Sequence, residues 1–159
     1  MFGVRVVSAA LRLVWPGLRR RRPEHAFERA TRALAGQRPH EALAALDAAP
    51  LDAATANKRG VALVALGRRA AALEAFCDAL GFDERHAPAL TNIGNLLLED
   101  GLPNDAIDYF RAALVAQPLY GIAHRNLAVA LKRLGRRREA VRALRTAARL
   151  EGRRAGGGA

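Results

Sequence analysis

Apolar residues from position 54 onward recur every three to four positions, the spacing of one face of an α-helix. The apolar blocks come in pairs, with a glycine-containing turn inside each pair. This pattern predicts first helices near residues 54–66, 88–100 and 122–134, and second helices near residues 69–80, 103–116 and 137–150. Pro88 and Pro103 fall at predicted helix starts, where no backbone donor is needed. No strand-like alternation competes, so we expect an all-helical chain.

The predicted helix pairs repeat with a period of 34 residues. The windows 53–86, 87–120 and 121–152 align without gaps. Six columns of this alignment agree in residue size and type: Gly60, Gly94 and Ala128; Leu63, Leu97 and Leu131; Gly67, Gly101 and Gly135; Ala72, Ala106 and Ala140; Phe76, Phe110 and Leu144; and Ala79, Ala113 and Ala147. A fixed period of this length is typical of a stacked helical repeat array.

The columns have physical reasons. The column that begins with Gly60 lets two helices approach closely, and the one that begins with Gly67 ends the first helix of each pair in a left-handed residue. Small residues in the Ala72 column let the second helix cross the first, and the large residues of the Phe76 column fill the space between pairs.

Upstream, residues 23–34, Gly36 and residues 42–46 predict one more helix–turn–helix, cut short by Pro50. The predicted organisation is therefore a basic amphipathic segment over 1–22, a degenerate first repeat or cap over 23–52, repeats over 53–86, 87–120 and 121–152, and a flexible tail over 153–159. About three repeats are needed for a stable stack, so this chain has enough.

The columns resemble the tetratricopeptide repeat. Residues 87–118 match its pattern best, at Ile93, Gly94, Leu97, Gly101, Ala106, Phe110, Ala113 and Pro118. The sequence departs from the pattern at Arg59, where an apolar residue is usual, and at Glu84 and Gly152, where proline is usual. The resemblance implies an all-α, right-handed α-solenoid that acts as a non-catalytic scaffold or adaptor for another protein.

The resemblance also implies that the first helices of the pairs line a concave groove. Asn92 and Asn126 lie 34 residues apart, in one column with Lys58, although asparagine is unfavourable inside a helix. Because an amide both donates and accepts, such a column can hold the backbone of an extended peptide. The column resembles the asparagine ladder of the O-linked N-acetylglucosamine transferases, without their catalytic domain. Further groove candidates are Asn57, Asn95, Arg125, Lys132 and Arg133.

An alternative for the asparagines stays open. The asparagines can merely cap or solvate a helix surface. The cationic residues at the C-terminal end of the groove, if they face a ligand, favour one with a carboxylate or acidic side chains.

The net charge of +11 is concentrated at the two ends of the chain. Residues 1–22 hold six arginines and no acid. Residues 23–120 hold nine basic and thirteen acidic residues, a net of −4, and residues 121–159 hold eleven basic and two acidic residues, a net of +9. Basic ends suit acidic proteins, anionic lipid or nucleic acid, and can equally form a solvated face.

The N-terminal segment is apolar but too short and too charged for a transmembrane helix. Arg5 and Arg12 lie on one polar stripe of a predicted helix, and Trp15 precedes the arginine run that begins at Arg19. These four residues are candidates for contact with an anionic membrane. The alternatives are a helix that packs on the repeats and a disordered segment.

The last repeat predicts two other kinds of contact. Its dense arginines can follow a phosphate backbone, but residues 121–159 contain no Phe, Tyr or Trp for base stacking, which disfavours nucleic acid as the partner. No polar helix is predicted after residue 150 to cover Val141, Leu144 and Ala148, so this face is also a candidate for homo-oligomerisation.

We expect no catalysis. The histidines at 25, 40, 86 and 124 lack metal-ligand spacing, and no phosphate-binding loop motif is present, so neither a metal nor a cofactor is predicted. Cys77 is the only cysteine, so no intrachain disulfide can form, and we expect its thiol to be packed within its helix. The expected location is the cytoplasm, with peripheral membrane contact through residues 1–22 as an open alternative.

Overall fold

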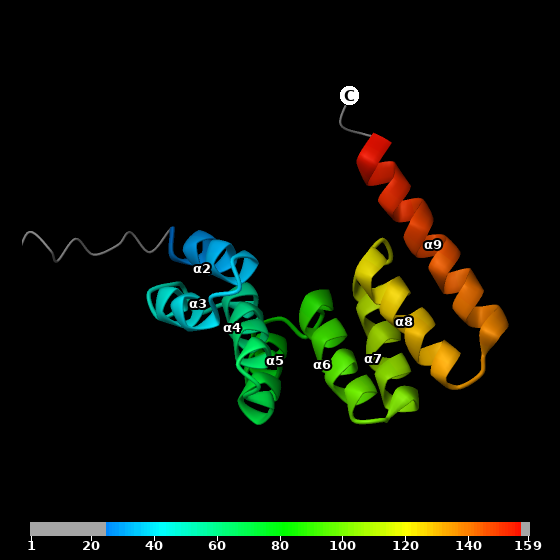
Figure 1. Cartoon of the computed structure of the whole chain (residues 1–159), viewed down its shortest axis with the longest axis horizontal. Coiled ribbons are helices and arrows are strands. Elements are labelled where there is room, and N and C mark those ends of the chain that lie inside the picture. Colours follow the sequence, from blue (N-terminus) through cyan, green and yellow to red (C-terminus); the bar gives the residue numbers. More distant parts are fainter. Residues whose placement is uncertain (1–24, 157–159) are drawn as a thin grey trace, which may run out of the picture.

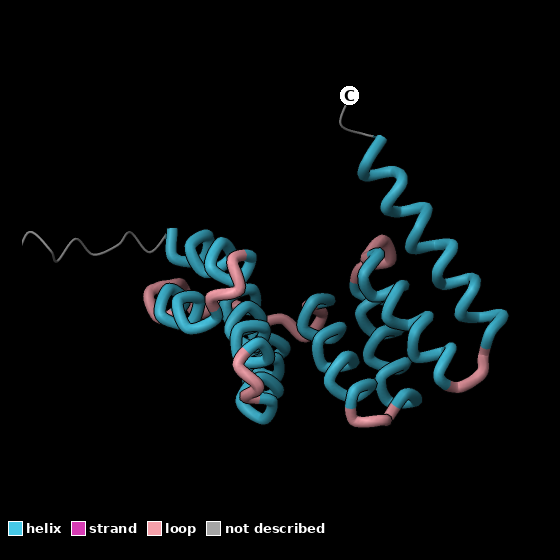
Figure 2. The backbone as a smooth tube through the Cα atoms, viewed as in Figure 1, coloured by secondary structure: helices cyan, strands magenta, loops and turns pink. Residues whose placement is uncertain are grey.

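The computed structural model describes residues 25–156, which form eight α-helices and no strand (Figures 1 and 2). The helices are α2 (Ala26–Ala35), α3 (Pro39–Leu46), α4 (Ala53–Ala65), α5 (Arg69–Phe82), α6 (Ala87–Glu99), α7 (Pro103–Ala116), α8 (Gly121–Arg133) and α9 (Arg137–Gly156). The predicted fold class is confirmed: consecutive helices form antiparallel pairs, and each pair packs on the next.

The six predicted helices of the three repeats are all found, with starts and ends shifted by at most two residues, except at the end of α9. That helix runs to Gly156, into the segment that the sequence analysis assigns to a flexible tail. Arginine and alanine are good helix formers, and Glu151 in this extension forms an ion pair with Arg125 of α8. The extension is therefore helical up to Gly156.

Turns between paired helices depend on residues in the left-handed region. Gly67, Gly101 and Gly135 have φ angles of 71°, 76° and 71°, as their column predicts. In the first pair, α2–α3, the left-handed residue is Gln37 with φ 54°. Gly36 is the turn residue predicted from the sequence, but it has φ −86° and only caps α2.

The core between helices is built from the glycine and phenylalanine columns. A Cβ atom added to Gly94 would lie 2.6 Å from the ring of Phe110, and one added to Gly60 would overlap the ring of Phe76. Both rings are almost completely buried. Because the third repeat has Leu144 in place of a ring, it can carry Ala128 where the others need glycine.

Two sequence expectations need comment. Cys77 is exposed on α5, so the prediction of a packed thiol is wrong; its neighbour Phe76 takes the buried face of that helix. The membrane-contact candidates Arg5, Arg12, Trp15 and Arg19 lie outside the described residues. Within residues 25–156, no helix is both long enough and apolar enough to cross a membrane.

Candidate functional site

The first helices α4, α6 and α8 neighbour one another along the array, and the predicted groove residues lie on them. Between α4 and α6 the surface is hollowed by about 130 Å³. The hollow is lined by Val61, Val64, Phe76, Asn92, Asn95, Leu96 and Glu99. Its lining combines amide groups with apolar side chains, and both valines are partly open to solvent.

The four asparagines form two hydrogen-bonded pairs that join neighbouring first helices. The Nδ2 group of Asn92 donates to Oδ1 of Asn57 at 2.9 Å, between α6 and α4. The Nδ2 group of Asn126 donates to Oδ1 of Asn95 at 2.8 Å, between α8 and α6. Both bonds are partly buried. The asparagines are thus neither helix caps nor purely solvated groups.

These pairs leave hydrogen-bonding capacity unused. A primary amide has two N–H donors and an oxygen that accepts two bonds, and each pair uses one donor of one residue and one lone pair of the other. The remaining groups of Asn92 and Asn95 border the hollow. Their use by a bound peptide stays a prediction.

Lys58 lies apart from the asparagine pairs. Its ammonium nitrogen sits 4.9 Å from the centre of the Phe27 ring on α2. Partial burial lowers the pKa of Lys58, because removing an ammonium from water disfavours its charged form. Lys58 therefore links α4 to the first pair, and the predicted column of Lys58, Asn92 and Asn126 is not one continuous row.

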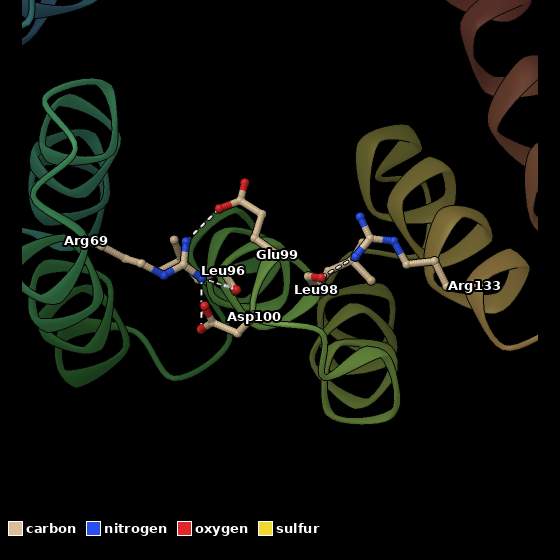
Figure 3. A network of polar contacts seen from close by, with 6 residues as sticks. All are labelled: Arg69, Leu96, Leu98, Glu99, Asp100 and Arg133. Atoms are coloured by element: carbon tan, nitrogen blue, oxygen red, sulfur yellow. Dashed lines mark hydrogen bonds and ion pairs between the residues drawn. The ribbon is translucent and has the colours of Figure 1, made fainter.

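The C-terminal turn of α6 is held from both sides by arginines (Figure 3). Arg69, the first residue of α5, contacts the Glu99 carboxylate at 2.6 Å and the Asp100 carboxylate at 2.9 Å, and also donates to the Leu96 carbonyl. From α8, Arg133 donates to the Leu98 carbonyl. Cations at a helix C-terminus are favourable because the last carbonyl groups have no partner within the helix.

This arrangement raises the pKa of Arg69 through its hydrogen bonds to Asp100 and then Glu99. Arg69 is not among the residues predicted from the sequence. The signal that was available is the acidic pair just before the turn glycine Gly101, which lies about one repeat after Arg69. Its counterpart Arg133 was predicted as a groove residue, but its guanidinium binds α6.

The other two predicted cations separate. Arg125 is exposed and forms an ion pair with Glu151 on α9. Lys132 is exposed, and no carboxylate in the described part of the chain lies within ion-pair distance of it. Of the three predicted cations Arg125, Lys132 and Arg133, Lys132 alone has no side-chain partner among the described residues.

No group of three or more His, Cys, Asp or Glu side chains able to hold a metal ion occurs among the residues that the structure describes. The polar groups described above on α4, α6 and α8 are amides and arginines that bond to neighbouring helices.

Residues 87–118 match the family model of the tetratricopeptide repeat, abbreviated TPR. Among curated proteins, none matches the chain significantly by sequence. Several solved structures share its fold. The crystal structure of MamA is 20% identical with a TM-score of 0.68, over 95% of this chain and 88% of that one.

Two further structures of this fold concern peptides. YrrB, a TPR protein with an unusual peptide-binding site, is 20% identical with a TM-score of 0.61, over 80% of this chain and 68% of that one. The second TPR of Spaghetti (RPAP3), bound to the HSP90 peptide SRMEEVD, is 21% identical with a TM-score of 0.58, over 62% of this chain and 91% of that one. The described chain is thus an all-helical array of paired TPR-like repeats, and the finer resemblance to glycosyltransferase repeats stays a prediction.

Proposed function

We propose that this chain is a non-catalytic protein-interaction scaffold that binds an extended peptide segment of a partner along its first helices. The observation that supports this proposal most is the hollow between α4 and α6. There Val61 and Val64 offer apolar contact beside the unused amide groups of Asn92 and Asn95. An extended peptide needs both, because its backbone requires hydrogen bonds while alternate side chains require pockets.

The two peptide-associated structures of the same fold are consistent with this function. On the chain itself, the charges favour a peptide that places an acidic residue at the C-terminal end of the repeat array. Lys132 is an exposed cation there without a partner among the described residues, while Glu99 at the edge of the hollow is already paired with Arg69. The peptide therefore meets little repulsion along this face.

Selection of binders to the full chain from a displayed library of random peptides tests the proposal directly. We expect enriched peptides that lose binding at least about tenfold, or about 1.4 kcal/mol, when Val64→Arg fills the hollow. The matched control is Val115→Arg, since Val115 is 74% exposed on α7 and lies outside the hollow. Equal binding by the two variants, with unchanged helical circular dichroism, would remove the hollow as the peptide site.

A further inference from the structure

Helix α9 exposes a face that the two preceding repeats cover. In the column formed by Phe76, Phe110 and Leu144, the first two residues are 1% and 0% exposed. Phe76 packs with Ile93 and Leu96 of α6, and Phe110 packs with residues of α8, so each is covered by the first helix of the next repeat. Leu144 is 47% exposed.

The polar part of this face also repeats an earlier contact. Arg137 begins α9 as Arg69 begins α5, and the two lie two periods apart in the sequence. Arg69 holds the last turn of the helix that packs on α5, through Glu99, Asp100 and a backbone carbonyl. Among the described residues, the guanidinium of Arg137 has no hydrogen-bonding or ion-pair partner, and only its backbone N–H is bonded, to the Gly135 carbonyl. Helix α5 binds α6 through an apolar surface and an arginine, and α9 has a counterpart of each.

A shallow hollow of about 550 Å³ runs along the same face. It is lined by Arg137, Arg138, Val141, Arg142 and Arg145. Beside it, Leu144 and Ala148 are exposed. An apolar stripe next to a row of arginines is complementary to an amphipathic helix that has acidic residues at one edge.

We propose that this face of α9 is a docking site for one amphipathic helix of another protein, whose last turn carries two acidic residues. The helix would lie on α9 as α6 lies on α5, with its acidic last turn at Arg137. This site is separate from the peptide hollow between α4 and α6, and the inference does not depend on the proposed function.

The charges disfavour the other occupants. In a head-to-tail stack of two copies, α2 would take the place of the docked helix. The last turn of α2 contains Arg32. Before its turn residue Gln37 it has the uncharged residues Ala35 and Gly36. At the corresponding positions before Gly101, α6 has Glu99 and Asp100. Like charges would then face each other. A nucleic acid would pair with the arginines but would leave the apolar stripe unused.

The chain itself supplies a probe, namely a fluorescent synthetic peptide with the sequence of residues 86–102, which includes α6. Its control peptide carries the equivalents of Glu99→Gln and Asp100→Asn. We expect the full chain to bind the acidic peptide in fluorescence anisotropy, and the neutral peptide at least about threefold more weakly. Arg137→Ala should abolish the difference between the two peptides, and Leu144→Asp should weaken the binding of both.

Matched variants locate the site. Arg149→Ala removes the same charge from the far end of α9 and should preserve the preference for the acidic peptide. Val64→Arg, in the other hollow, should leave this binding unchanged, which separates this inference from the proposed peptide groove. Circular dichroism checks that each variant is folded.

Several outcomes would overturn the inference. These are equal affinity for the two peptides, no binding at peptide concentrations near the millimolar range, and a preference that survives Arg137→Ala. Light scattering gives a further outcome: a dimer that becomes a monomer with Leu144→Asp would assign this face to a second copy instead. Binding of anionic vesicles or duplex DNA that depends on Arg137, without binding of the peptide, would assign it to lipid or nucleic acid.

Discussion

At the scale of single residues, the close approach of paired helices depends on the size match between two columns. Gly94 faces the Phe110 ring, and the third repeat has Ala128 and Leu144 at the corresponding two positions. We infer from this exchange that the two residues together, and not the glycine alone, set the helix separation.

Gly94→Ala should therefore destabilise the chain by about 1–3 kcal/mol, because its Cβ would lie 2.6 Å from the Phe110 ring. In the double variant Gly94→Ala/Phe110→Leu, we expect the loss of unfolding free energy to be about 1 kcal/mol smaller than the sum of the losses in the two single variants. Urea denaturation of the four chains measures this coupling. Additive effects would contradict the size match.

The asparagine pairs make a second prediction at this scale. If the bond between Asn57 and Asn92 contributes to stability, Asn57→Ala and Asn92→Ala should couple by about 0.5–1.5 kcal/mol in a double-mutant cycle. Asn57→Ala combined with Asn126→Ala is the control, because Asn126 bonds to Asn95 instead. Coupling of equal size in both cycles would mean that the effect is not the direct bond.

These pairs also show where sequence reasoning ends. The period of 34 places Asn92 and Asn126 in one column, but the bonds join residues 35 and 31 positions apart. A helical side chain leans toward the N-terminus of its own helix and meets a neighbour that is out of phase with it. The repeat alignment therefore identifies which helices carry the site, while the partners of each amide follow only from the packing.

At the scale of elements, helix boundaries were the most predictable feature. The turn glycines and the prolines at helix starts fix them locally, which is why α4 to α8 match the prediction within two residues. The end of α9 was not predictable in the same way. Its extension includes Glu151, which pairs with Arg125 on another helix, and no local signal encodes that contact.

The last turn of α6 provides a prediction for this scale. Arg69→Ala should lower the melting temperature more than Arg68→Ala. Arg69 binds Glu99 and Asp100, whereas its exposed neighbour Arg68 has no ion pair in the described chain. The difference should shrink at high salt, since exposed ion pairs are screened. Calorimetry in 0.05 M and 1 M sodium chloride compares the two variants. A difference that is independent of salt would point to lost packing of the Arg69 stem.

At the scale of the whole molecule, a repeat array is held together by contacts between neighbours only. The contacts between helices follow this rule: each pair packs on the pair before and after it. The pairs α4–α5 and α6–α7 have neighbours on both sides, and the hydrophobic clusters of α6–α7 extend into α5 and α8. Cohesion along the array is thus greatest at its centre.

Hydrogen exchange should reflect this gradient. Amides of α6 and α7 should exchange slowest, and those of α2, α3 and the C-terminal half of α9 fastest, because terminal units open without disturbing two interfaces. Phe110→Ala removes a ring that is 0% exposed at the centre, and large-to-small changes of this kind cost about 3–5 kcal/mol. It should accelerate exchange in α6, α7 and α8 together, whereas Leu144→Ala should affect only α8 and α9. If both variants raised exchange uniformly along the chain, the molecule would be one cooperative unit, and the independence assumed for the two proposed binding faces would fail with it.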